Sequence, residues 1–385
     1  MAVTVTGFLD CTQGGVIMRS TDHRTDGRRR VFGLKGLFVL SALSLLVVTA
    51  KVPPSLAATD LFVGSYFNNS VLEYDGTTGA FVRAFVPTGS GGLNGPYGLV
   101  FGSNGNLLVS SGISTGSVLE YNGTTGAFVR AFVSPGSGGL IGPFGVAFGP
   151  NGNLFVSNAN TTFTESNVLE YNGTTGAFVR PFVTTNSGGL QVPVGLAFGP
   201  NGNAFVSSFF NSSVLEYNGT TGAFVRAFVP SGSGGLLAPE GLVFGPNGDL
   251  FVADNGPGFA GTSSVLEYNG TTGAFVRAFV PTGSGGLTSA QGLVFGPNGN
   301  LLVSSFFNGT GTGAATGSVL EYDGTTGAFL RVFIPPGSGG LSGATLLTFG
   351  PATAPPGTPV PEPSTWLLLG SGLACLVVWK RQKAA

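Results

Sequence analysis

VLEYNGTTGAFVRAFV, residues 214–229, is the stretch of sequence that decides the fold. A second segment, GLVFGPNGDLFV at residues 241–252, recurs with the same period of 46 to 54 residues. Self-similarity at such a period is typical of propellers and other repeat architectures. The six copies of the first segment start at Val71, Val118, Val168, Val214, Val265 and Val319.

Each unit contains four short runs of strand-forming residues separated by turn signals. In one unit the first two runs are residues 241–244 and 250–252, joined by a Pro-Asn-Gly turn. The third run is Val-Leu-Glu-Tyr and the fourth is Ala-Phe-Val-Arg-Ala-Phe-Val. Asn-Gly and Asp-Gly favour tight hairpins because these residues tolerate positive φ. Four antiparallel strands in about 40–50 residues predict a propeller blade.

The two ends of the repeat region predict how the ring closes. The chain enters at a second strand, residues 61–63, and leaves at a segment like a first strand, residues 345–349. We therefore expect an all-β fold, a six-bladed propeller over residues 59–350 whose C-terminal strand completes the first blade. Closure removes the open edge that a stack of sheets would leave. The pattern resembles NHL-type and gluconolactonase-like propellers across nearly all of residues 60–350.

Differences in length between the units are confined to one connection. The Val of Val-Leu-Glu-Tyr and the following Arg are 12 residues apart in all six copies. The loop between the second and third strands varies from 6 to 14 residues. These loops share one face of a propeller with the connections between blades. Insertions confined to one face usually mark the face that interacts.

The variable loops also carry aromatic side chains. Such rings, beside Asn and Ser, are suited to stacking on sugar rings. The alternative is that they extend the second strands and are buried between blades, as Phe usually is. The candidates are Tyr66, Phe67, Phe163, Phe209, Phe210, Phe259, Phe306 and Phe307.

Charge is scarce and unevenly distributed. The 385 residues include 16 Lys+Arg and 17 Asp+Glu, so 9% are charged, against about 25% in an average domain. Residues 59–350 hold six Arg and thirteen acids, a net charge of −7, and contain no Lys, His or Cys. This argues against nucleic acid as a partner. It also excludes a His-based triad or a His/Cys zinc site within this region.

Most of the charge in the repeats forms a pattern. Each unit has one Glu on its third strand and one Arg ten residues later on its fourth. The two residues lie opposite or diagonally across a hairpin, close enough to pair. We interpret the pairs as structural, because a catalytic Arg would not recur six times. They are Glu73/Arg83, Glu120/Arg130, Glu170/Arg180, Glu216/Arg226, Glu267/Arg277 and Glu321/Arg331.

Two carboxylates outside this pattern are candidate metal ligands. Glu240 begins a first strand and Asp254 ends the adjacent second strand. The resemblance to gluconolactonase-like propellers implies a divalent metal held in the channel by Glu, Asn and Asp. Oxygen-ligand metals need about six ligands, and the other first strands start mostly with apolar residues. We therefore expect no metal, cofactor or catalytic residue, and interpret both carboxylates as solvated groups on the rim.

The N-terminal region, residues 1–58, has the form of a secretory signal peptide. Basic residues including Arg30 and Lys35 precede an uncharged run over residues 36–50, and small residues follow. That order is typical of a signal peptide. Fifteen apolar residues are short for a spanning helix, although an uncleaved anchor is the alternative. Met1 and Met18 both fit as the start.

The C-terminal region consists of a linker, residues 351–359, and a tripartite tail, residues 360–385. The tail has a Pro-Glu-Pro motif, an apolar run over residues 366–379 and a basic end. It resembles the PEP-CTERM sorting signal, and a plain tail anchor is the alternative. The resemblance implies a transmembrane helix, an exosortase-type protease as partner, and export to the surface or exopolysaccharide matrix of a Gram-negative bacterium. Its key residues are Pro361, Glu362, Pro363, Lys380 and Arg381.

These features together favour an exported, non-enzymatic propeller that binds extracellular material. Exopolysaccharide or another surface protein is the expected partner. Two alternatives stay open: a gluconolactonase-like hydrolase or lyase with a metal in the channel, and a structural surface protein that self-associates.

Overall fold

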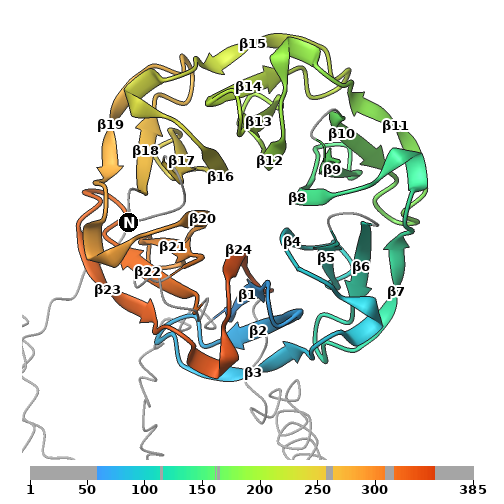
Figure 1. Ribbon diagram of the computed structural model, residues 1–385, viewed down its shortest axis with the longest axis vertical. Coiled ribbons are helices and arrows are strands. Elements are labelled where there is room, and N and C mark those ends of the chain that lie inside the picture. Colours follow the sequence, from blue (N-terminus) through green and yellow to red (C-terminus); the bar gives the residue numbers. More distant parts are fainter. Residues whose placement is uncertain are drawn as a thin grey trace, which may run out of the picture. The chain divides into compact units, whose positions relative to one another are not determined.

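The computed structural model describes residues 59–112, 116–160, 162, 165–256, 263–307 and 316–351. Strands β1 to β24 form six four-stranded antiparallel sheets around a central axis (Figure 1). The prediction of an all-β six-bladed propeller is confirmed. The expected signal region, sorting tail and hydrophobic helices lie outside the described residues. Within the described ranges, no helix is long and apolar enough to cross a membrane.

Each blade runs from an inner strand beside the axis to an outer strand at the rim (Figure 1). The inner strands are β4 (Leu99–Phe101), β8 (Pro143–Phe148), β12 (Pro193–Phe198), β16 (Pro239–Phe244), β20 (Ala290–Phe295) and β24 (Ala344–Phe349). The second strands are β1 (Leu61–Ser65), β5 (Leu107–Ser111), β9 (Leu154–Ala159), β13 (Ala204–Ser208), β17 (Leu250–Asp254) and β21 (Leu301–Ser305).

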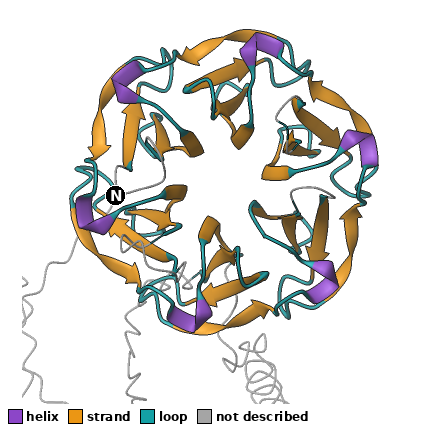
Figure 2. Cartoon of the chain, in the orientation of Figure 1, coloured by secondary structure: helices purple, strands orange, loops and turns teal. Residues whose placement is uncertain are grey.

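The third strands are β2 (Ser70–Tyr74), β6 (Ser117–Tyr121), β10 (Ser166–Tyr171), β14 (Ser213–Tyr217), β18 (Ser264–Tyr268) and β22 (Ser318–Tyr322). The outer strands are β3 (Phe81–Val86), β7 (Phe128–Val133), β11 (Phe178–Val183), β15 (Phe224–Val229), β19 (Phe275–Val280) and β23 (Phe329–Ile334). A short 3-10 turn follows each outer strand near the rim (Figure 2). These turns are η1 (Ser90–Gly92), η2 (Ser137–Gly139), η3 (Ser187–Gly189), η4 (Ser233–Gly235), η6 (Ser284–Gly286) and η7 (Ser338–Gly340).

The ring closes within the first blade. Its strand order is β24-β1-β2-β3, so the last strand pairs with the first (Figure 1). The pairing is antiparallel, with Leu61 opposite Phe349 and Phe62 opposite Thr348. The predicted closure by the C-terminal strand is therefore confirmed.

Neighbouring blades are joined by buried hydrophobic layers. The layer between the fourth and fifth blades includes Phe205, Val214 and Leu250, which are all fully buried. At the outer part of such a junction, the Tyr217 hydroxyl donates a hydrogen bond to the Ser187 carbonyl of η3 in the preceding blade at 2.8 Å. Close packing there requires glycine: Gly188 has a φ of 62°, and a Cβ on it would lie 2.2 Å from the Phe224 ring.

The predicted Glu/Arg pairs lie side by side in each blade, with Nε–Oε2 distances of 2.5 to 2.7 Å. The two partners differ in exposure, which the sequence pattern did not indicate. Each Glu is buried, whereas the Arg side chains are 37 to 46% exposed. The pairs are Glu73/Arg83, Glu120/Arg130, Glu170/Arg180, Glu216/Arg226, Glu267/Arg277 and Glu321/Arg331.

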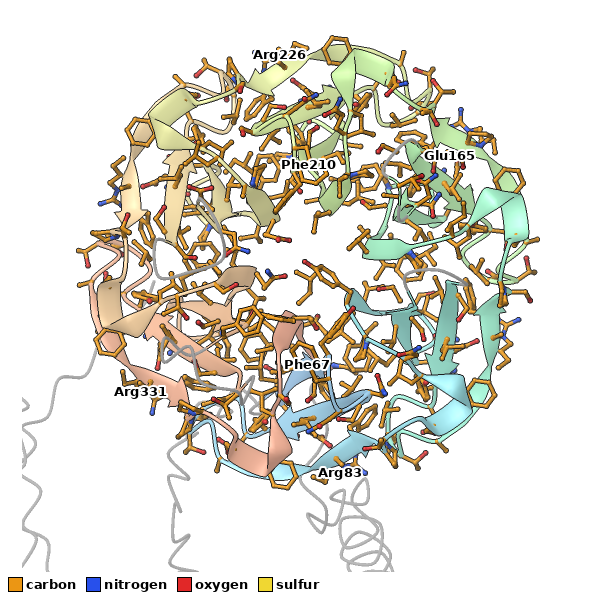
Figure 3. All side chains as sticks on the ribbon, in the orientation of Figure 1. Phe67, Arg83, Glu165, Phe210, Arg226 and Arg331 are labelled. Carbon is orange, nitrogen blue, oxygen red and sulfur yellow. The ribbon has the colours of Figure 1, made fainter. Side chains whose placement is uncertain are left out.

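The fourth blade shows the geometry of a pair. Glu216 is directly opposite Arg226 in the hairpin of β14 and β15. The Arg226 guanidinium also lies over the Phe228 ring, 4.8 Å from its centroid. Figure 3 shows Arg83, Arg226 and Arg331 at the outer rim. Each Arg therefore covers a buried ring while its outer surface stays in contact with solvent.

The same Arg side chains connect each blade to the next, whereas the sequence predicted only pairing inside a blade. Nη2 of Arg226 donates to the Thr271 carbonyl at 2.7 Å, in the turn before the outer strand of the fifth blade. Nη2 of Arg331 donates to the Thr77 carbonyl at 2.8 Å, which links the last blade to the first. The equivalent bonds are Arg83 to Thr124 at 2.7 Å, Arg130 to Thr174 at 2.9 Å, Arg180 to Thr220 at 2.6 Å and Arg277 to Thr325 at 2.7 Å. The repeated Arg is therefore part of a chain of contacts around the ring.

Each Glu of the rim is buried, and in every blade except the first it accepts hydrogen bonds from at least one Asn amide as well as from its Arg. Glu216 is 3% exposed. Its Oε1 accepts hydrogen bonds from the Asn201 and Asn203 amides at 2.9 and 2.8 Å. Burial alone raises the pKa of this carboxyl, but the hydrogen bonds from the two Asn and Arg226 outweigh burial and lower the pKa.

Replacing Glu216 with Ala should lower the free energy of unfolding by about 2 kcal/mol. The reason is that the Asn201 and Asn203 amides and the Arg226 Nε lose their acceptor. Thermal unfolding followed by circular dichroism measures the effect as a drop of a few degrees in Tm. The control is Glu165→Ala, which removes an exposed carboxylate. Equal melting temperatures for the two variants would contradict a stabilising role of the pair.

The first blade differs from the others because, among the described residues, no Asn amide donates to its rim Glu. In the second blade Asn106 precedes β5 and donates to Glu120 at 2.8 Å. Asp60 holds the corresponding position before β1 and has no amide to donate to Glu73. The fifth blade also has an Asp, Asp249, directly before its second strand, but there Asn247 donates to Glu267 at 3.0 Å. Burial, followed by the charge of the neighbouring Glu73, raises the pKa of Asp60 to about 6.

This shift gives the closing blade a pH dependence. The folded-state pKa of Asp60 lies above its ordinary value of 3.8. The contribution of Asp60 to the stability of the folded state is therefore fully present below the pKa that this carboxyl has in the unfolded chain. That contribution is lost as the pH rises through about 6. Near neutral pH, two carboxylates face each other at the seam of the ring.

Asp60→Asn should introduce the amide that four of the other blades have at this position and stabilise the protein at neutral pH. The Tm of the variant minus that of the wild type should increase as the pH rises from about 4 to about 7. Thermal melts across this pH range measure the difference. Glu165→Gln, which leaves the Asp60–Glu73 pair intact, should show no such increase. A Tm difference for Asp60→Asn that is constant with pH would argue against the coupling.

Candidate functional site

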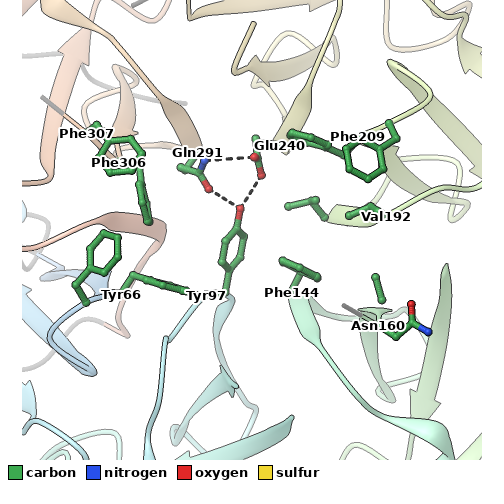
Figure 4. Close-up of a pocket in the computed structure, with 14 residues that line it drawn as sticks. Tyr66, Tyr97, Phe144, Asn160, Val192, Phe209, Glu240, Gln291, Phe306 and Phe307 are labelled. Carbon is green, nitrogen blue, oxygen red and sulfur yellow. Dashed lines mark hydrogen bonds between the residues drawn. The ribbon is translucent and has the colours of Figure 1, made fainter. Parts of the chain in front are cut away.

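A cavity of about 720 Å³ opens where the inner strands meet the variable loops. We call it the cup. Figure 4 shows side chains from several blades converging on it. It is lined by Tyr66, Phe67, Tyr97, Phe144, Ala159, Asn160, Val192, Val194, Phe209, Phe210, Glu240, Gln291, Phe306 and Phe307.

The backbone places the loop aromatics at the mouth of the cup. Strands β1, β13 and β21 each end in Ser, and an aromatic residue follows directly. There the chain hydrogen-bonds to the connection that precedes the inner strand. The bonds are Tyr66 N to Gly343 O at 3.0 Å, Phe209 N to Val192 O at 3.1 Å and Phe306 N to Ser289 O at 2.8 Å.

Aromatic and aliphatic side chains form two walls. On one side, Phe306 lies 5.6 Å from Tyr66 and 4.7 Å from Phe307, measured between ring centroids. Phe67 lies 5.3 Å from Phe306, so the first and sixth blades share this wall. On the other side, Phe144 and Phe209 pack against Ala159, Val192 and Val194. Such walls favour a ligand with flat apolar surfaces.

Six of the eight predicted aromatic candidates line the cup: Tyr66, Phe67, Phe209, Phe210, Phe306 and Phe307. The alternative that they are buried between blades does not hold for Phe67 and Phe210. These rings are 49% and 53% exposed, and Figure 3 labels both. Phe163 and Phe259 lie outside the described residues.

The polar part of the cup is a triangle of three side chains from three blades. The Tyr97 hydroxyl lies 2.6 Å from Glu240 Oε2 and also contacts Gln291 Oε1. Gln291 Nε2 lies 3.3 Å from Glu240 Oε1. Tyr97 precedes β4 in the second blade and Glu240 belongs to β16 in the fifth, so Tyr97 reaches across the channel (Figure 4). The triangle thus joins opposite sides of the ring.

The backbone around Glu240 is held by the preceding blade. Ser207 Oγ in β13 accepts a hydrogen bond from Gly195 N at 2.6 Å and donates to the Glu240 carbonyl at 2.8 Å. A Cβ on Gly195 would lie 2.3 Å from that carbonyl oxygen. Glycine at this point lets adjacent inner strands approach closely. The position of the Glu240 side chain is therefore fixed by packing of the inner strands.

The prediction that Glu240 is a solvated rim carboxylate is wrong. The residue is 4% exposed. Burial raises its pKa to about 7, against the hydrogen bonds from Tyr97 and Gln291 and the nearby Asn255 amide, which lower it. Nδ2 of Asn255 makes no hydrogen bond of ordinary distance and angle with the described residues. Burial also raises the pKa of Tyr97 well above its usual value.

Asp254, expected on the rim as well, has a structural position. It is 4% exposed. Its Oδ1 accepts hydrogen bonds from the backbone N–H of Leu237 at 3.0 Å and of Ala238 at 2.8 Å. It is therefore turned to the connection before β16 and is not among the residues that line the cup. Among the described residues, no three His, Cys, Asp or Glu side chains gather as metal ligands would.

Sequence reasoning did not nominate Tyr97, Phe144 or Gln291 as site residues. A signal for them was present, because each occupies the repeat position of Glu240 at the start of an inner strand. Side chains at one repeat position of a propeller surround the same level of the axis. Polar and aromatic residues at that position therefore indicated a lined channel.

The comparisons with known proteins concern the tail and the fold. Residues 359–382 match the PEP-CTERM protein-sorting motif, which confirms that prediction. No curated protein matches the chain in sequence.

Solved structures share the fold at low identity. A chain of a nidogen/laminin complex is 16% identical with a TM-score of 0.56, over 77% of this chain and 100% of that one. A Bacteroides caccae protein of unknown function is 17% identical with a TM-score of 0.54, over 76% and 99%. A Xanthomonas campestris gluconolactonase is 16% identical with a TM-score of 0.49, over 64% and 84%. These similarities concern the fold alone.

The class of protein follows from these findings. The chain is a six-bladed β-propeller that carries a PEP-CTERM sorting motif at its C-terminus. The motif implies exosortase processing, export, and a location at the surface or outside the cell of a Gram-negative bacterium.

Proposed function

We propose that this protein is a binding protein displayed at the surface or in the extracellular matrix, and that the cup is its binding site. The ligand we propose is a segment of exopolysaccharide. On this proposal, a signal peptide in residues 1–58 exports the chain and an exosortase processes the tail at residues 360–385. The propeller then presents the cup to the matrix.

One observation carries the proposal: the aromatic side chains of the variable loops converge on a single cavity. Its volume of about 720 Å³ lies within the range of about 300–1,000 Å³ that is usual for ligand sites. The exposed faces of Phe67 and Phe210 offer stacking surfaces, and Asn160 is a polar residue of the lining. Stacking rings together with a few polar groups in the lining suit the apolar faces of sugar rings.

A catalytic function has less support. Among the described residues that line the cup, Glu240 has the only carboxyl group, and none is His or Lys. General acid–base hydrolysis usually employs two such groups, and a metal mechanism employs several ligands. We therefore propose no reaction for the cup.

The combined variant Phe209→Ala with Phe306→Ala should lose at least about half of the polysaccharide captured in a pull-down. Each substitution removes a ring from a different wall, and lost ring contacts weaken binding by about tenfold or more. The measurement uses exopolysaccharide purified from the source bacterium and the full chain. The control is Phe275→Ala, which removes a ring of the outer rim. Unchanged capture by the combined variant would refute the cup as the polysaccharide site.

Self-association is a second candidate function, supported by the outer strands. Each outer strand is the last in its sheet and carries an exposed aliphatic side chain, for example Val129 at 47% and Val225 at 47% exposure. An unpaired strand edge with exposed apolar residues is a template for pairing with another chain. The feature recurs in all six blades, which suits lateral assembly.

On this candidate, Val129→Lys with Val225→Lys should reduce assembly, because two added charges oppose edge pairing. Light scattering at increasing protein concentration measures the molar mass. The wild type should increase in mass with concentration, and the variant should stay closer to monomeric. The matched control, Thr125→Lys with Thr221→Lys, adds the same charge in the neighbouring turns. A wild type that stays monomeric throughout would rule this candidate out.

A further inference from the structure

We propose that the cup is an uncharged site that selects uncharged ligands over anions, because Glu240 is present there as a neutral carboxylic acid. This inference rests on the proposed function of the cup as a glycan-binding site. It narrows the ligand to neutral sugars with apolar ring faces, and it disfavours sugars that carry carboxylates. The selection depends on the groups around the polar triangle.

The first argument is the position of the cations. The six Arg of residues 59–350 are its only bases, and each is paired with a rim Glu. No Arg, Lys or His is among the residues that line the cup. An anionic ligand entering the cup would therefore give up its hydration without gaining an opposite charge, which disfavours its binding.

The second argument is a count of protons in the polar triangle. Three contacts join Tyr97, Glu240 and Gln291, and each contact needs one proton between its two polar atoms. Tyr97 supplies one proton, and the Gln291 amide supplies one to whichever neighbour its nitrogen faces. If Glu240 is ionised, only two protons are available for the three contacts, so one contact always brings two acceptor atoms together. Exchanging the oxygen and nitrogen of the Gln291 side-chain amide changes which contact this is, but the number of protons stays at two.

A protonated Glu240 supplies the missing proton. The carboxyl then donates from Oε2 to the Tyr97 oxygen, Tyr97 donates to Gln291 Oε1, and Gln291 Nε2 donates to Glu240 Oε1. All three contacts become hydrogen bonds in one cyclic arrangement. The geometry of the triangle thus favours the neutral acid.

The burial of Glu240 favours the same protonation state. It raises the pKa of this carboxyl to about 7, although hydrogen bonds from Tyr97, Asn255 and Gln291 act in the opposite direction. The titratable groups around it are Tyr97, with Tyr66 beside Tyr97, and Asp254 at the end of the adjacent β17. The Asp254 carboxyl accepts from the Leu237 and Ala238 N–H groups instead. No cation among the described residues faces Glu240 to stabilise its charged form.

The test compares two probes that differ in one charge. They are 4-nitrophenyl glucoside, which is neutral, and 4-nitrophenyl glucuronide, which carries a carboxylate at the same ring. Calorimetry with the full chain measures both affinities from about pH 5 to about pH 9. We expect the glucoside to bind at least about tenfold more tightly than the glucuronide. The glucoside affinity of the wild type should decrease as the pH rises through about 7, because Glu240 ionises.

Glu240→Gln should give a glucoside affinity independent of pH and close to the wild-type value at low pH. Asp60→Asn is the matched control, since it changes another carboxyl that titrates near pH 6 and should keep the wild-type pH dependence. The comparison of the two probes uses only the wild-type protein. It therefore tests the preference for a neutral ligand even if a variant fails to fold. Calcium and EDTA should leave both affinities unchanged.

Several results would overturn the inference. They are equal or tighter binding of the glucuronide, no binding of either probe, a glucoside affinity constant with pH in the wild type, and a gain in affinity with calcium. The proposed function is judged separately by the polysaccharide pull-down. Capture of polysaccharide with a preference for the glucuronide would keep that function and reject the neutral cup. Preference for the glucoside without capture of polysaccharide would keep the neutral cup and reject the proposed function.

Discussion

The pairing of β24 with β1 is the constraint on which the rest of the structure depends. A closed ring of six sheets forms only if every blade turns the chain by the same amount. That requirement explains why the hairpin from the third to the outer strand has the same length in every unit. It also explains why insertions are confined to the loop between the second and third strands. Since these loops meet at one end of the channel, closure of the ring and formation of the cup have the same origin.

Closure also accounts for an irregular feature of the rim in the first blade. Five blades have a turn before their second strand, with an Asn or Asp as its last residue. The first blade has no such turn, because its inner strand comes from the other end of the repeat region. Glu73 therefore has no counterpart of the turn residue Asn104, which donates to Glu120 in the second blade, and its neighbour is the Asp60 carboxyl. The seam is thus distinguished chemically as well as topologically, while the chain of Arg contacts continues across it through Arg331 and Thr77.

The fold could be predicted in detail, whereas the cup could be predicted only in part. Repeat spacing and turn residues determine blade number, strand order and the closing strand, because these depend on local sequence and on counting. The aromatic candidates were found for the same reason, since they belong to the loops of variable length. Burial of Glu240 and its contact with Tyr97 depend on how opposite blades face each other across the channel. Residues 97 and 240 are far apart in sequence, and no local pattern shows that their side chains meet.

The distribution of charge separates the rim of the propeller from the cup. All six Arg are at the outer rim, where each is shared between a Glu of its own blade and a carbonyl of the next. This arrangement stabilises the ring with few charged residues and leaves no cation among the residues lining the cup. A buried carboxyl without a nearby cation is neutralised most simply by a proton. The scarcity of charge in the sequence therefore agrees with the arrangement in space: ion pairs connect the blades at the rim, whereas apolar rings and a buried carboxyl whose pKa is raised by burial line the cup.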